Sequence, residues 1–143
     1  MSRVIRIESG ASTRTRVLRR LAQALRAATQ PTNSSGAEAR DILAFLALGL
    51  ATLQESVEET ASAWERRGYW VKADQFRQKW AWGPRVLASL EASLHQGDLL
   101  RAGASALEIA AILADLRVDA GRGRGKAWKG AWEAWRSTRS VRC

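Results

Sequence analysis

Histidine, cysteine and clustered carboxylates build most catalytic and metal sites, and this chain of 143 residues has few of them in useful patterns. Its only histidine, His95, lies four residues after Glu91, which gives one pair of potential metal ligands on a helix but no cluster. A histidine near a helix end more commonly interacts with the helix C-terminus. The only cysteine, Cys143, is the last residue. We therefore expect no metal site, no cofactor and no catalytic residue.

The segment AGRGRGKA, residues 120–127, has the glycines and the lysine of a phosphate-binding loop but departs from that motif at two positions. Ala120 stands where the first glycine is required, and Ala127 replaces the Ser or Thr that binds magnesium. No strand pattern precedes the segment. The sequence therefore predicts a flexible basic loop here and a non-enzymatic protein.

Tryptophan interleaved with Arg and Lys is typical of binding surfaces, and it occurs first at residues 64–82, WERRGYWVKADQFRQKWAW. Indole rings stack on nucleic-acid bases while basic side chains contact phosphates. Trp64, Phe76 and Trp80 fall on the predicted apolar faces of helices, which assigns them to packing. Trp70 and Trp82 lie off those faces and are the interface candidates.

A second tryptophan-rich segment lies near the C-terminus, where Trp128, Trp132 and Trp135 share one face of a short helix predicted for residues 126–139. This face could bind nucleic acid, an anionic membrane or a protein groove. Alternatively, it folds back onto its own bundle or onto a sister subunit, because three exposed tryptophans would lower solubility. Packing is the favoured alternative. The basic residues beside this face are Lys126, Lys129 and Arg136.

Charge is distributed unevenly along the chain, whose net charge is +9. Residues 1–30 hold seven Arg against one acidic residue, and residues 117–143 hold eight basic residues against two acidic ones. The middle of the chain is slightly acidic. This asymmetry indicates either attraction to a polyanion such as nucleic acid or self-association of basic ends with acidic middles. The sequence leaves both interpretations open.

The elements that must position these residues are helical, because Ala, Leu, Arg and Glu dominate and only two Pro occur. The sequence predicts an all-α bundle built on a long central antiparallel αα-hairpin, with arms at residues 37–67 and 70–96 joined at Gly68. Pro84 must kink or restart the second arm. Apolar residues 42–53 present more surface than one helix can cover, which makes dimerisation plausible.

The flanking segments complete a single domain. A basic amphipathic helix is predicted at residues 13–29, and Gln96-Gly97-Asp98 separates the hairpin from a further helix at 98–117. The expected parts are a basic N-terminal arm, helix and linker at residues 1–36, the bundle core at 37–117, and a flexible basic tail with the short Trp-rich helix at 118–143.

The apolar run at residues 42–53 is also too short to span a bilayer, which takes about 20 residues, and the N-terminus lacks the apolar core of a signal peptide. A single cysteine is compatible with a reducing compartment. We expect a soluble, cytoplasmic protein for which a membrane surface is not the partner.

Together these patterns predict a non-enzymatic nucleic-acid-binding or ribonucleoprotein-type small helical subunit, as a homo-oligomer or part of a larger complex. The alternative is a protein–protein assembly module, a homo-oligomeric helical bundle with no nucleic-acid role. The residues expected to contact nucleic acid are Arg16, Arg19, Arg20, Trp70, Trp82, Arg122, Arg124, Lys126 and Lys129.

Overall fold

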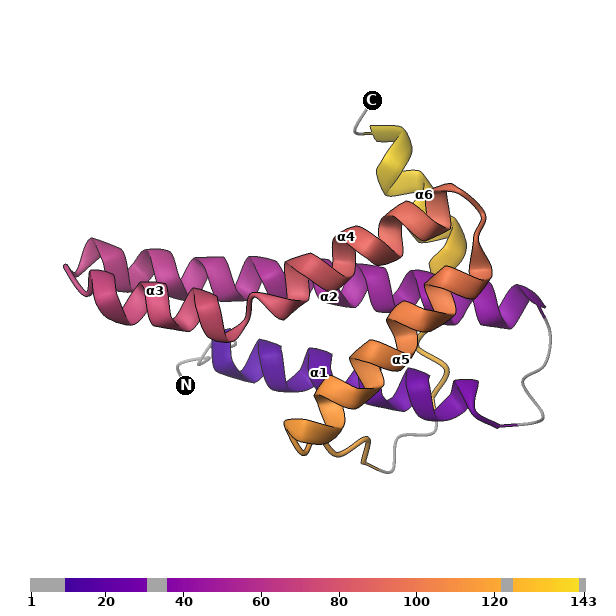
Figure 1. Cartoon of the computed structure of the whole chain (residues 1–143), viewed down its shortest axis with the longest axis horizontal. Helices are drawn as coiled ribbons and strands as arrows, with labels where there is room; N and C mark the ends of the chain where they lie inside the picture. The colour runs from indigo at the N-terminus through magenta and orange to yellow at the C-terminus, as the bar shows by residue number, and fades with distance from the viewer. Residues whose placement is uncertain (1–9, 31–35, 122–124, 142–143) are drawn as a thin grey trace, which may run out of the picture.

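A computed structural model describes residues 10–30, 36–121 and 125–141 of the chain, and these residues form six α-helices and no β-strand (Figure 1). The prediction of an all-α protein is confirmed. The helices are α1 (Gly10–Ala28), α2 (Gly36–Arg66), α3 (Trp70–Lys79), α4 (Trp82–His95), α5 (Leu99–Asp115) and α6 (Ala131–Val141).

The ends of α2 and α4 follow from the glycines that the sequence places there. Gly68 adopts a φ of +84°, and Tyr69 N–H then donates to Trp64 O at 2.9 Å. This turn satisfies a carbonyl that the last turn of a helix would otherwise leave unpaired. Gly97 repeats the geometry with a φ of +68°, and Asp98 then caps α5 by accepting a hydrogen bond from Arg101 N–H.

Pro84 divides the second half of the predicted hairpin into two helices. A proline lacks the N–H that an interior helical residue donates and clashes with the preceding turn. The chain therefore leaves helical geometry after Lys79 and starts α4 at Trp82, which puts Pro84 in the first turn, where no N–H is required. Of the predicted kink or restart, the structure has the restart.

Helix α2 is the centre of the molecule, and α1, α3, α4, α5 and α6 all contact it. Leu46, Leu50 and Leu53 are completely or almost completely buried. At Gly49 a Cβ atom would lie 2.5 Å from Leu21 Cδ2, so the glycine permits the close approach of α1. The apolar first half of α2, from which dimerisation was inferred, is covered largely by helices of its own chain.

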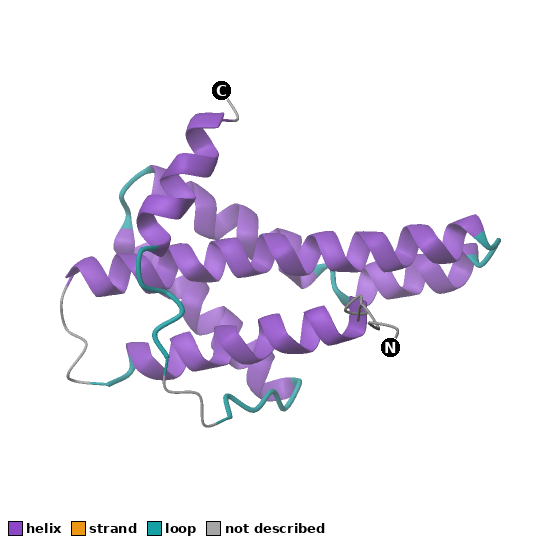
Figure 2. Ribbon diagram, turned by 180° about the vertical axis from the view of Figure 1, so that it is seen from behind, coloured by secondary structure: helices purple, strands orange, loops and turns teal. Residues whose placement is uncertain are grey.

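The chain beyond α5 crosses α1 and returns to the N-terminal half of α2, where α6 packs (Figure 2). The short helix predicted at residues 126–139 begins later than expected. Residues 127–130 form turns, and α6 starts at Ala131 after Gly130, whose φ is +80°. Trp128 therefore lies in a turn, while Trp132 and Trp135 lie on the helix.

Candidate nucleic-acid interface

Helix α1 has one apolar face, which packs on the bundle, and one basic face, which is exposed. Val17, Leu18 and Leu21 are buried against the bundle, and α1 contains five Arg and no acidic residue. Arg16 and Arg20 lie one turn apart, and Arg19 lies beside them on the same exposed side. The three arginines that the sequence nominates on this helix thus form one surface.

A groove of about 420 Å³ runs between α1, α2 and the turn before α6. Arg16 and Arg20 line it from α1, and Lys129 lines it from the turn. Phe45 and Leu48 of α2 form apolar parts of its wall. We call this site the basic groove. It combines cations that can neutralise phosphates with an aromatic ring and aliphatic carbons that can contact a base.

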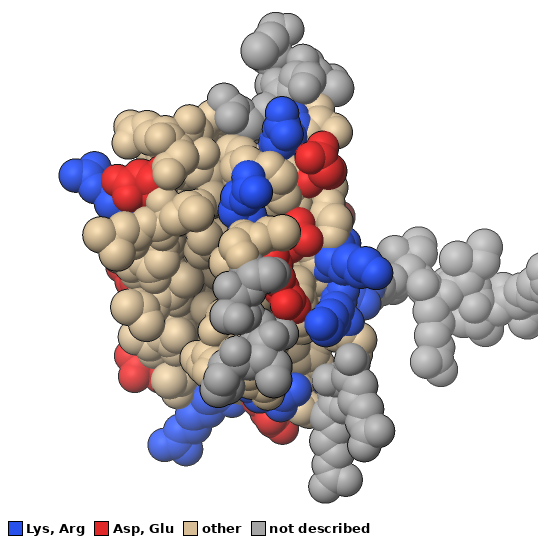
Figure 3. Space-filling model, turned by 90° about the vertical axis from the view of Figure 1, so that its right-hand side faces the viewer, with Lys and Arg blue, Asp and Glu red and all other residues tan. Residues whose placement is uncertain are grey.

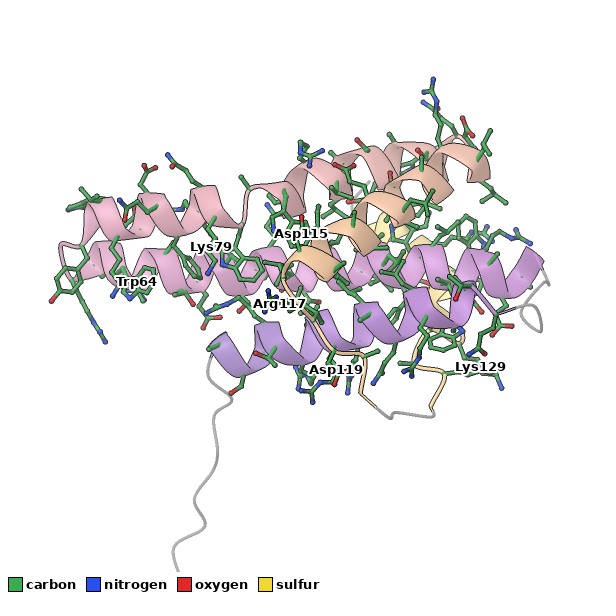
Figure 4. The ribbon with its side chains drawn as sticks, turned by 60° about the horizontal axis from the view of Figure 1, so that its bottom comes forward. Trp64, Lys79, Asp115, Arg117, Asp119 and Lys129 are labelled. Carbon is green, nitrogen blue, oxygen red and sulfur yellow. The ribbon has the colours of Figure 1, made fainter. Side chains whose placement is uncertain are left out.

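The connection from α5 to the tail lies against the same helix. Gln23 Nε2 donates to Ala120 O at 2.7 Å, and Arg26 Nη1 donates to Gly121 O at 3.0 Å. Figure 4 shows Asp119 beside α1 and Lys129 further along it. Gly121 therefore lies next to the basic face of α1. Two nominated residues, Arg122 and Arg124, lie outside the described residues.

Lys126, also nominated, is engaged with α2. Its Nζ lies 3.4 Å from Glu38 Oε1, and Trp128 Nε1 donates to the same carboxylate oxygen at 3.2 Å. Glu38 therefore attaches the turn at both a cation and an indole. The Lys126 side chain is paired with Glu38, whereas Lys129 lines the basic groove.

Asp41, one turn further along α2, caps α6 from outside that helix. Its two carboxylate oxygens accept from Gly130 N–H at 3.3 Å and from Trp132 N–H at 3.0 Å. A carboxylate at a helix N-terminus satisfies amides that have no partner within the helix and interacts favourably with the helix dipole. The guanidinium of Arg40 lies 5.5 Å from the centre of the Trp132 ring. Glu38 and Asp41, the first acidic pair, attach residues 126–132 to α2.

The tail tryptophans pack against their own chain. Trp128 and Trp135 are only 6% and 3% exposed, and the Trp135 ring lies 5.2 Å from that of His95. Packing is therefore the alternative that the structure supports for this face. The buried rings of Trp128 and Trp135 are not accessible for stacking on bases, while Trp132 is half-buried.

The two nominated tryptophans of the central stretch lie apart from the basic groove. Trp82 is half-buried, with its ring 6.2 Å from that of Trp80. Trp70 is 63% exposed, but it begins α3 at the end of the projecting α2–α3 arm, away from α6 (Figure 1). Trp64 and Lys79 mark this arm in Figure 4, at the opposite side of the molecule from Lys129. The nominated residues do not form one site.

Arg77 joins α3 to α2 within the arm. It donates to Glu58 Oε1 at 2.7 Å and to Glu65 Oε1 at 2.6 Å. These hydrogen bonds lower the pKa of both carboxyl groups and raise the pKa of Arg77. Glu58 and Glu65, the second acidic pair, neutralise this arginine locally.

Arg14 is a structural residue that the sequence reasoning missed. Its Nη1 donates to Thr60 Oγ1 at 2.9 Å and to Ser56 Oγ at 3.2 Å, and its guanidinium lies 4.9 Å from the centre of the Phe76 ring. Partial burial lowers the pKa of Arg14. The signal was its spacing, since Arg14 lies three and four residues before Val17 and Leu18 and therefore on the apolar face.

Two further findings on the described residues concern metal binding and membrane insertion. Residues 10–30, 36–121 and 125–141 contain no group of three or more His, Cys, Asp or Glu placed to hold a metal ion. No helix within these ranges has both the length and the apolar character needed to cross a membrane. On the end face drawn in Figure 3, basic and acidic side chains of the described residues alternate rather than forming a continuous basic surface.

Comparison of the chain with protein-family models, with curated proteins and with solved structures returned no match in any of the three. The candidate function therefore rests on the geometry of the basic groove.

Proposed function

We propose that this chain is a non-enzymatic nucleic-acid-binding subunit of the ribonucleoprotein type and that it binds single-stranded nucleic acid along α1. The observation that carries the proposal is the basic groove. Residues more than 100 positions apart, Arg16 and Arg20 on α1 and Lys129 before α6, line one opening on a helix without acidic residues. Such convergence of cations is the electrostatic footprint of a polyanion site.

The groove walls favour a single strand over a duplex. Phe45 and Leu48 offer apolar contact to an unstacked base, while Arg16 and Arg20 can pair with the phosphates on either side of it. A duplex keeps its bases stacked and would use only the cations. Arg19 lies on the same exposed side of α1 and adds a further cation for the phosphate backbone.

The remaining nominated cations fit the same proposal. Arg122 and Arg124, which lie outside the described residues, are kept in the proposal for their charge alone. Lys126 shares Glu38 with Trp128 and would contribute less. Trp70 and Trp82 are left out of the proposed site because of their positions.

We also propose that the central scaffold is an antiparallel hairpin, with α2 as one arm and α3 and α4 as the other, and that residues 1–36 and 118–143 are binding ends on one domain. The contacts of α2 with α3 and α4 and the Gly68 turn support this arrangement. In this proposal the hairpin holds Lys129 against α1 through the first acidic pair.

The test is the salt dependence of binding to a single-stranded homopolymer, measured by fluorescence anisotropy. The variant Arg16→Gln/Arg19→Gln/Arg20→Gln should bind at least about tenfold more weakly, and the slope of log K against log salt should fall by about 2, at roughly 0.7 per lost phosphate contact.

The matched control is Arg66→Gln/Arg67→Gln/Lys72→Gln, which removes the same charge from exposed positions on the arm. It should keep nearly the parental affinity and slope. Equal losses in both variants would show that only net charge matters, and an absence of binding at low salt would overturn the proposed function.

A further inference from the structure

Helix α5 is apolar on two opposite faces. Its inner face, with Ala102, Ile109 and Leu113 buried, packs on the bundle. On the outer side, Leu100 and Leu107 are 88% and 74% exposed. A surface helix of a soluble protein normally places polar residues toward solvent, and a helix that is apolar all round is normally buried. The outer face of α5 thus has the character of a covered surface.

The exposed residues of this face form a regular seam. They recur with alternating spacings of four and three residues, which is the pattern of helices that pack lengthwise against each other. We call them the outer α5 face: Leu100, Ala104, Leu107, Ala111 and Ala114. The leucines can act as knobs, and the alanines allow the backbones to approach closely. In Figure 1, α5 lies on the near side of the molecule, and no other helix is drawn in front of it.

All three charged residues of α5 lie along one edge of that seam. Arg101, Glu108 and Asp115 are seven residues apart, which puts them at the same heptad position. The order of charges is basic at the start of the helix and acidic in the middle and at the end. Glu108 is already paired within the chain, with Oε1 2.7 Å from Arg85 Nη1.

We propose that two copies of this chain associate through the outer α5 face, with their α5 helices antiparallel. An antiparallel pair places Arg101 of each copy opposite the partner's Asp115, so the edge is complementary to itself under a two-fold axis. The two helix dipoles also oppose each other favourably in this arrangement. A parallel pair would set like ends side by side and would leave both charges without an opposite neighbour.

Glu108 falls at the centre of the antiparallel pair, where it meets its symmetry mate. Its own Arg85 supplies the compensating charge at that point. The interface therefore consists of an apolar seam, two Arg101–Asp115 pairs at its ends and two Arg85–Glu108 pairs at its middle. Because each helix contributes only two leucines and three alanines, we expect a weak dimer with a Kd on the order of micromolar. This association does not depend on nucleic-acid binding.

The first test is the molar mass of the full chain in solution, measured by sedimentation over a broad range of concentration. The parent should approach twice the chain mass of 15.7 kDa. Leu107→Glu places a charge at the centre of the seam and should raise the dimer Kd by about tenfold or more. A parent that stays monomeric throughout, or that assembles beyond a dimer, overturns the proposal.

Val71→Glu is the matched control. Val71 is 71% exposed on α3, and the substitution introduces the same charge far from α5. It should dimerise like the parent. If Val71→Glu and Leu107→Glu weaken the dimer equally, association does not use α5 and the proposal fails. Circular dichroism of both variants should match the parent, since both side chains face solvent.

The second test isolates the antiparallel arrangement. Arg101→Glu and Asp115→Arg should each weaken homodimerisation, because like charges then meet at both ends of the seam. Mixing the two single variants should restore dimers. In the heterodimer the two substituted side chains meet at one end with opposite charges, and the unchanged Asp115 and Arg101 meet at the other. The intrachain neighbour Asp98, 3.6 Å from Arg101, is the same in both states and cannot explain the rescue. If mixing restores nothing, the antiparallel register is wrong.

Discussion

The two tryptophan-rich regions of this chain have similar compositions and different environments. Both interleave indole rings with Lys and Arg, and each is held by a pair of acidic side chains on α2. In the tail, Glu38 and Asp41 bind an indole N–H and the backbone N–H groups at the start of α6. In the α2–α3 arm, Glu58 and Glu65 bind the guanidinium of Arg77.

The difference lies in what the acidic residues bind. In the tail, Asp41 binds backbone N–H groups, and Glu38 binds an indole N–H together with the Lys126 ammonium, which lies 3.4 Å away. In the arm, Glu58 and Glu65 both bind the guanidinium of Arg77 and neutralise that cation, while Trp70 at the tip is 63% exposed. The first acidic pair thus holds Trp128 against the bundle, whereas the second acidic pair binds a cation and leaves Trp70 exposed. A Trp-Lys-Arg pattern alone does not distinguish these outcomes.

The largest expected effect tests the burial of the tail rings. Trp135→Ala removes a side chain that is 3% exposed and should lower the free energy of unfolding by about 3–5 kcal/mol. Trp70→Ala removes an exposed ring and should change it by no more than about 0.5 kcal/mol. Urea denaturation followed by circular dichroism measures both. Equal effects would contradict the contrast between the two regions.

A smaller effect tests how the tail is attached. Asp41→Ala removes the acceptor for Gly130 N–H and Trp132 N–H and should cost about 1–2 kcal/mol in the same denaturation experiment. Asp41→Asn keeps one side-chain oxygen as an acceptor and should cost less. Hydrogen exchange of the first α6 amides should accelerate more in the alanine variant than in the asparagine variant. If the two variants behave alike, the carboxylate does not cap α6.

Local sequence signals predicted the all-α class and several helix ends. Gly68, Gly97 and Pro84 have direct conformational consequences, so the helix ends they set could be located from the sequence. The apolar run at residues 42–53 likewise contains Leu46, Leu50 and Leu53, which are buried in α2. At the end of α5 the signal was missing, because Arg117 adopts a φ of +56° that is usually left to glycine. The sequence accordingly placed that boundary about two residues late, within the usual uncertainty of helix ends.

The candidate site was predicted only in part, because it depends on contacts between distant residues. Charge and position in the sequence singled out Arg16, Arg20 and Lys129, but they did not predict that the three side chains line one groove. Nothing local indicates that Glu38 and Asp41 bind the tail, since their partners lie about 90 residues away. Arg14 was overlooked because a charged residue on an apolar face contradicts the pattern used to find that face.

The smallest expected effect concerns the ion pairs of the arm, and it depends on pH. Arg77 lowers the pKa of Glu58 and of Glu65 in the folded chain. A group with a depressed folded pKa stabilises the fold above its unfolded pKa, about 4.3 for Glu, and loses that contribution as the pH falls through its folded value. Arg77→Gln should therefore destabilise the chain near neutral pH, and the difference from the parent should shrink in acid. Urea midpoints of both proteins at a neutral and an acidic pH measure this change.

Lys79→Gln is the control, because it removes the same charge from α3, where the ammonium lies 5.8 Å from the centre of the Trp80 ring rather than beside a carboxylate. Its difference from the parent should depend much less on pH, and a dependence as large as that of Arg77→Gln would show that net charge, not the acidic pair, is responsible.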